Sequence, residues 1–122
     1  MRTMFIAVLT SLLLALPLLA QENAAGEIKN IGELYRKGQF SDAVIKATEL
    51  LAKPALSKSD SILTILWLSK ALAMNKQADL SQQYLTTLVK MDPNTDFDGD
   101  KEPARFGKVW FKFIGDTKFV PG

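Results

Sequence analysis

The chain repeats itself at an offset of 38 residues, and this repeat constrains the fold more than any other feature. Residues 31–44 and 69–82 share one pattern, in which a helical stretch ends in a short polar turn and a second helical stretch begins with a small residue. The small residue is Ala43 in the first copy and Ser81 in the second. Repeats with periods of about 20–50 residues are typical of stacked helical units that hold other polypeptides. The pattern therefore predicts an all-α fold and a binding function.

The first 20 residues have the layout of a secretory signal peptide. Arg2 precedes an apolar run over residues 4–16, and Pro17 and a short apolar stretch then lead to the polar Gln21. We predict cleavage after Ala20 and export to the periplasm or the exterior of the cell. The alternative is an uncleaved membrane anchor, because an apolar segment over residues 4–20 is at the lower length limit for spanning about 30 Å of hydrocarbon.

The composition excludes several classes of function. The chain contains no Cys and no His, which rules out Cys–His and Ser–His–Asp catalysis and removes the commonest metal ligand. The remaining Asp, Glu, Lys and Tyr residues show no spacing that implies chemistry, so an enzyme is the weakest alternative. A net charge of +2 gives no reason to expect a nucleic-acid partner. We therefore predict a non-enzymatic protein without a cofactor or a metal site.

Five helices follow from the apolar periodicity and the breakers between them. We expect the first over about residues 24–37, ending before Gly38. The third, over about residues 59–75, is apolar almost all round and is expected at the centre of the domain. The predicted N-terminal caps are Ser41 or Asp42 for the second helix, Ser59 or Asp60 for the third, and Asp79 for the fourth. We divide the chain into a signal peptide (1–20), two helical hairpins (21–94), an acidic loop and an aromatic helix (95–116), and a tail (117–122).

The fifth helix, near residues 102–114, carries an apolar stripe at positions i, i+3, i+4, i+7 and i+8. We predict that this stripe caps the preceding hairpin, because two repeats are fewer than the three or so that such stacks need. The alternative is an exposed partner-binding face, which Phe111 favours because it lies off the stripe. The stripe consists of Phe106, Val109, Trp110, Phe113 and Ile114.

An acidic loop over residues 92–102 invites comparison with a calcium site, since clustered carboxylates bind hard cations. An EF-hand loop that starts at Asp92 requires Gly at its sixth position, which is Phe97 here. We therefore expect a solvated turn and no bound cation.

The residues of the repeat resemble a tetratricopeptide repeat over about residues 24–94. In that family a first helix with a Leu-Gly pair and a Tyr alternates with a second helix that begins at a small residue and closes with Asp-Pro. This chain departs from the pattern at Lys76, which stands at the position of the turn Gly, and at Pro54, to which the closing Pro of the first repeat is displaced. The matching residues are Leu34, Tyr35, Gly38, Phe40 and Ala43 in the first copy, and Trp67, Leu68, Ser69, Leu72, Ser81, Leu85, Leu88 and residues 91–94 in the second.

The resemblance implies two antiparallel helical hairpins and a C-terminal capping helix, which together form a fragment of a right-handed α-α superhelix. It also implies an apolar groove lined by the first helix of each pair, which would bind a protein or peptide partner in the bacterial envelope. Ile28 and Gly32 occupy positions of the family's carboxylate clamp, so we expect that activity to be absent. Leu63 and Leu66 have an alternative role as ordinary core. The implied groove residues are Ile28, Gly32, Tyr35, Arg36, Leu63, Leu66, Lys70 and Ala73.

Two functional hypotheses remain at this point. In the first, the exported domain binds a protein or peptide partner and contacts no membrane once the signal peptide is removed. In the second, an uncleaved N-terminal helix anchors the chain as a structural subunit of an envelope complex.

Overall fold

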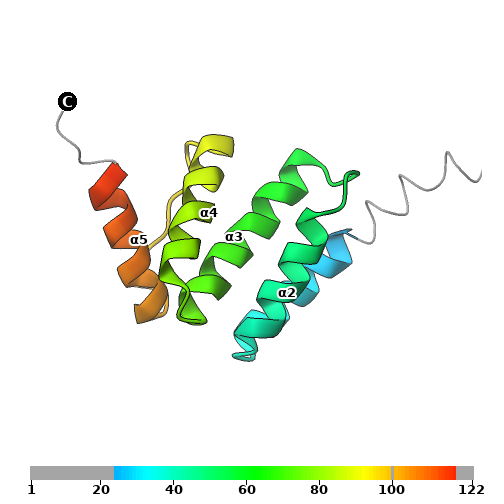
Figure 1. Cartoon of the computed structure of the whole chain (residues 1–122), viewed down its shortest axis with the longest axis horizontal. Helices are drawn as coiled ribbons and strands as arrows, with labels where there is room; N and C mark the ends of the chain where they lie inside the picture. The colour runs from blue at the N-terminus through cyan, green and yellow to red at the C-terminus, as the bar shows by residue number, and fades with distance from the viewer. Residues whose placement is uncertain (1–23, 100, 118–122) are drawn as a thin grey trace, which may run out of the picture.

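The computed structural model describes residues 24–99 and 101–117, which form five helices and no strand (Figure 1). The all-α class is therefore confirmed. The predicted signal peptide, its alternative as an anchor, and tail residues 118–122 lie outside the described residues. The helices are an N-terminal helix over residues 24–36, α2 (Phe40–Leu51), α3 (Lys58–Met74), α4 (Ala78–Met91) and α5 (Ala104–Thr117).

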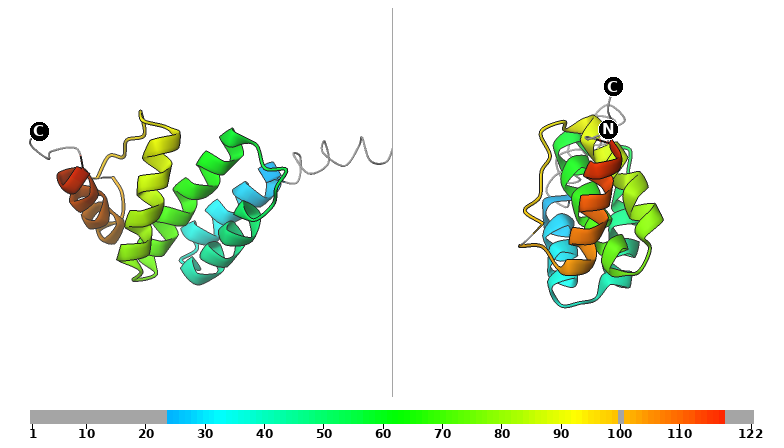
Figure 2. Two further views of the ribbon diagram at one scale, coloured as in Figure 1. Left: turned by 45° about the horizontal axis from the view of Figure 1, so that its top comes forward. Right: turned by 90° about the vertical axis from the view of Figure 1, so that its left-hand side faces the viewer.

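Helix α3 lies at the centre of the domain and packs against α2, α4 and α5. The helices follow one another in a row, from the N-terminal helix beside α2 to α5 at the opposite end (Figures 1 and 2). This position explains why α3 carries apolar residues around almost its whole circumference, since each side of it faces a neighbour. The sequence prediction of a central third helix agrees with this arrangement.

The apolar residues form two clusters, one on each side of α3. The first cluster joins the N-terminal helix and α2 to α3, and the second joins α3 to α4 and α5. Leu50, Leu68 and Leu72 are among the fully buried side chains of the first cluster. The second contains the large rings of Phe106 and Trp110, which are 0% and 1% exposed. Helix α5 is thus an integral part of the core.

The turn before α2 and the turn before α4 have the same backbone structure, 38 residues apart. Gly38 and Lys76 both adopt the left-handed conformation, with φ of 78° and 63°. In each turn the next residue donates its N–H to a carbonyl five residues earlier, which is the Schellman pattern of a helix C-terminus. The two bonds are Gln39 N–H to Leu34 and Gln77 N–H to Leu72, both 2.9 Å. The repeat seen in the sequence is therefore a repeat of backbone conformation.

The helix starts differ from the predicted caps. Each left-handed residue leads directly into the next helix, so Gln39 and Gln77 occupy the cap positions of α2 and α4 without a side-chain cap. For α3 the cap is Ser57, whose Oγ accepts from the Asp60 N–H at 3.1 Å. The predicted capping roles of Ser41, Asp42, Ser59, Asp60 and Asp79 are therefore wrong. Asp42, Asp60 and Asp79 lie in the first turns, where negative charge still stabilises a helix.

Small polar residues mark the contact between α3 and α4. The Ser81 hydroxyl donates to the Ser69 carbonyl at 2.7 Å, and the Ser69 hydroxyl donates to the Ile65 carbonyl at 2.8 Å. Both serines are fully buried. Because each hydroxyl has a partner, these residues allow a close helix contact without the cost of an unsatisfied polar group.

Candidate partner-binding site

The side chain of Trp67 connects the N-terminal helix to α3. The guanidinium carbon of Arg36 lies over the Trp67 ring, 5.5 Å from its centroid, and the Tyr35 ring centroid is also 5.5 Å from it. Gly32 makes this approach possible, because a Cβ at that position would lie 3.0 Å from the Trp67 ring. We call the surface formed by Arg36, Leu63, Leu66, Trp67 and Lys70 the Trp67 face.

Lys70 is one turn further along α3 and is enclosed by rings and a carboxylate. Its Nζ atom lies 2.8 Å from Oε1 of Glu102, and the two side chains are only 13% and 18% exposed. An ion pair that is shielded from water in this way is stronger than an exposed one, and ring faces attract the ammonium group further. The rings are those of Trp67 (5.3 Å), Phe97 (5.5 Å), Phe106 (5.9 Å) and Tyr35 (6.0 Å).

The carboxylate comes from residues 95–103, which we call the acidic segment. Its Phe97 ring packs edge-on against Phe106 and Trp110, with centroids 5.1 and 4.8 Å apart. A Cβ on Gly99 would lie 2.4 Å from the Phe111 ring, so only glycine fits there without a rearrangement. Seen end-on, the segment runs along the side of the molecule that carries the N-terminal helix (Figure 2, right). The chain thus covers part of this side with its own acidic and aromatic residues.

Two side-chain bonds attach α5 to the helices beneath it. Arg105 Nη1 donates to the Met74 carbonyl at 2.9 Å, at the C-terminal end of α3. Gln82 Nε2 of α4 donates to the Val109 carbonyl at 2.8 Å. These bonds, with the aromatic contacts, fix the place from which the acidic segment returns Glu102 to Lys70.

Tyr35 carries a polar group that its surroundings leave unpaired. Its hydroxyl oxygen is buried and has no hydrogen-bond partner among the described residues. Burial, and next the negative charge of Glu102, raise the pKa of Tyr35 from 10.0 to about 12. The hydroxyl therefore stays protonated at neutral pH.

The predicted groove residues fall into two groups. Leu63 is 46% exposed, Arg36 is exposed, and Leu66 is half-buried against the second cluster. Ile28 and Ala73, in contrast, belong to the core at 8% and 1% exposure. Their prediction as accessible groove residues is corrected here, because Ile28 packs into the first cluster and Ala73 into the second.

Tyr35 and Lys70 are half-buried, and they meet around the acidic segment. Sequence reasoning missed Glu102 and Phe97 as members of this site, and it treated Trp67 only as a repeat residue. One signal was present: the central helix carries a single Lys between Lys58 and Met74 with no acidic residue three or four positions away.

The predicted capping stripe lies on the buried side of α5. Phe106, Val109, Trp110 and Phe113 belong to the second cluster, and Ile114 packs half-buried against it. Phe111 points away and is 54% exposed. The stripe is therefore core, and Phe111 is its one large exposed neighbour on this helix.

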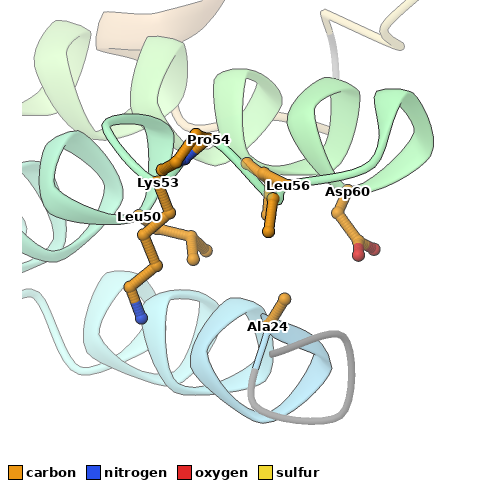
Figure 3. A pocket seen from close by; sticks show the side chains of 7 residues that line it. Ala24, Leu50, Lys53, Pro54, Leu56 and Asp60 are labelled. Atoms are coloured by element: carbon orange, nitrogen blue, oxygen red, sulfur yellow. The ribbon is translucent and has the colours of Figure 1, made fainter. Parts of the chain in front are cut away.

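A separate cavity of about 230 Å³ opens between the N-terminal helix and the connector that follows α2 (Figure 3). It begins at Ala24, the first described residue, and Lys53 and Asp60 are its only charged side chains. Lys53 also pairs with Glu27 at 3.0 Å in an exposed ion pair. The other lining residues are Leu50, Pro54, Ala55 and Leu56. This cavity does not include any residue of the predicted groove.

Within the described residues, no group of three or more Asp, Glu, His or Cys side chains is placed to hold a metal ion. In the acidic loop, Asp92 and Asp96 carboxylates instead accept backbone N–H bonds from Asn94 and Phe97, at 3.3 and 2.9 Å. Of the helices in the described part of the chain, none is long and apolar enough to cross a membrane.

Comparison with known proteins gives no relative: no protein-family model, no curated protein and no solved structure matches the chain. Functional reasoning for this protein therefore depends on its own residues and geometry.

Proposed function

We propose that this protein is a non-enzymatic binding module that holds a peptide or protein partner on its Trp67 face. The observation that carries the proposal is the exposure of Leu63, at 46%, one helical turn from Trp67 on the central helix. A large apolar side chain exposed beside an aromatic ring and a cation is typical of protein-binding surfaces. Most of the other large apolar side chains of α3 are covered by neighbouring helices.

We interpret the two helical pairs as tetratricopeptide-like and the row of helices as a fragment of a right-handed superhelix. The repeated left-handed turns at Gly38 and Lys76 support this interpretation, as does the burial of small residues at Ala43 and Ser81. In this interpretation the N-terminal helix and α3 are the first helices of the two pairs, and the Trp67 face lies between them. The partner would then bind where the family's grooves bind theirs.

A photo-crosslinking amino acid at Leu63 tests the proposal directly. The matched control is the same residue at Ile45, an equally exposed apolar position (53%) on α2. We expect irradiation of the cell envelope to join the protein to a partner from position 63 and not from position 45. Crosslinks of equal yield from both positions, or from neither, would contradict the proposal.

We further propose that the protein is exported and acts in the bacterial envelope, on the basis of the N-terminal sequence. The anchored structural subunit is the competing hypothesis. Mass spectrometry of the mature N-terminus distinguishes them, because a chain that begins at Gln21 has lost the apolar run and an intact chain retains it.

A further inference from the structure

Two cations lie over aromatic rings at neighbouring places on the same side of α3. Lys70 lies 5.3 Å from the Trp67 ring on one side, and Arg36 lies 5.5 Å from it on the other. The two places differ in their counter-charge. Lys70 has the Glu102 carboxylate at 2.8 Å, whereas no carboxylate of the described residues lies within ion-pair distance of Arg36.

The occupied place shows which chemistry this surface accepts. At Lys70 the chain's own acidic segment supplies a carboxylate, from Glu102, and an aromatic side chain, from Phe97. The carboxylate pairs with the cation while the ring packs on neighbouring apolar side chains. At Arg36 the corresponding elements are present on the protein side only: a cation, the Trp67 ring, and the exposed Leu63.

We propose that the Arg36 place takes the same chemistry from the partner: an acidic peptide segment with an aromatic or large aliphatic residue close to an Asp or Glu. Its carboxylate would pair with Arg36, and its apolar side chain would pack on Leu63 and Trp67. A guanidinium group can bind a carboxylate through two parallel bonds, which favours an acidic ligand over a merely polar one. This inference rests on the proposed function and names the class of partner.

The charges around Arg36 favour an acidic ligand. Lys29 lies two turns earlier on the same stripe of the N-terminal helix, and Lys37 follows Arg36 directly. Both are exposed. Glu33 is one turn before Arg36 but forms no ion pair with it. The exposed charge at this end of the helix is therefore mainly positive, which attracts acidic segments and repels basic ones.

A random peptide library displayed on phage and selected on the purified full chain tests the inference. We expect the selected peptides to combine Asp or Glu with an aromatic or large aliphatic residue. Arg36→Ala should weaken their binding by roughly tenfold, while Lys37→Ala, which removes an equally exposed neighbouring cation, should change it by less than about twofold. Arg36→Glu should shift a repeated selection toward basic peptides.

The variant Leu63→Gln separates failure of this inference from failure of the proposed function. Peptides that need Leu63 but are neutral or basic, or that bind Arg36→Ala unchanged, would overturn the acidic partner and leave the Trp67 face as a binding surface. A selection without any peptide that depends on Leu63 would overturn both.

Discussion

The two helical pairs share a backbone but differ in what covers them. The turns at Gly38 and Lys76 match in their left-handed φ and in their hydrogen bonds. Around the second pair, the acidic segment and α5 enclose Lys70 and bury Trp110 at 1% exposure. Next to the first pair, Arg36 and Leu63 remain exposed beside Trp67. One architecture thus provides a closed half, which stabilises the domain, and an open half, which is available to a partner.

The largest expected effect comes from removing the ring that closes the second half. Trp110→Ala should lower the free energy of unfolding by roughly 3–5 kcal/mol, because a fully buried aromatic side chain leaves a cavity between α3, α4 and α5. Phe111→Ala is the matched control, since Phe111 is 54% exposed and should change stability by less than about 1 kcal/mol. Urea denaturation measures both. Similar losses for the two variants would show that the closed half is not held by its buried stripe.

A smaller loss is expected when the enclosed ion pair is broken. Glu102→Gln should destabilise the protein by about 1–3 kcal/mol, because Lys70 would keep its charge in a poorly hydrated place without a carboxylate. Glu27→Gln breaks the exposed pair with Lys53 near the first half and should change stability by no more than about 0.5 kcal/mol. Thermal unfolding of the two variants at one ionic strength compares them. Equal effects would mean that the acidic segment does not shield the Lys70 pair.

The repeated turns should respond in opposite directions to exchange of their left-handed residues. Gly38→Ala should cost about 1–2 kcal/mol, since a Cβ is strained at φ of 78°. Lys76→Gly should relieve the same strain and gain up to about 1 kcal/mol, reduced by the greater freedom of glycine in the unfolded chain. Chemical denaturation of both variants is the measurement. A loss of stability in Lys76→Gly would contradict the equivalence of the two turns.

The smallest effect concerns the unpaired hydroxyl of Tyr35. Tyr35→Phe should leave stability unchanged or raise it by up to about 1 kcal/mol, because the substitution removes a buried polar group without a described partner. Tyr84→Phe is the control for loss of a tyrosine hydroxyl elsewhere. A clear loss of stability in Tyr35→Phe alone would show that the hydroxyl makes a stabilising bond.

Tyr35 also predicts a dependence on alkaline pH. The pKa is about 12 in the folded protein and 10.0 in the unfolded chain, so the folded state retains the proton longer. The stabilising contribution is complete below pH 10 and is lost as the pH rises toward 12. Stability curves over this range should fall more steeply for the natural protein than for Tyr35→Phe. Because Glu102 is the second cause of the shift, Glu102→Gln should lower the pKa of Tyr35, which an ultraviolet titration would detect.

Much of the helical framework could be predicted because it depends on local rules. Apolar spacing located the helices, Gly38 marked a helix end, and the all-round apolar character of α3 placed it at the centre. The caps were mispredicted for a physical reason. A left-handed residue one position before each cap sets the start of α2 and α4, and Lys76 does not announce that conformation as a glycine would.

The site was less predictable because it depends on contacts between distant segments. Nothing local to Glu102 indicates that it pairs with Lys70, since the pairing follows from the docking of α5 and the path of the acidic segment. For the same reason, helical spacing alone could not separate exposed Leu63 from buried Ala73 on the central helix. Arg36 and Lys70 were expected at the edge of the groove, but only the packed structure shows that one is open and the other occupied.

The two tryptophans, one in each half, allow the most direct test of the contrast between the open and closed halves. Trp110→Phe leaves Trp67 as the single reporter of the open half, and Trp67→Phe leaves Trp110 as the reporter of the closed half. Acrylamide quenching of fluorescence measures how accessible each indole is to the solvent. We predict that Trp67 is quenched several-fold more efficiently than Trp110, which is 1% exposed. Equal quenching of the two, or stronger quenching of Trp110, would contradict the division into an open and a closed half.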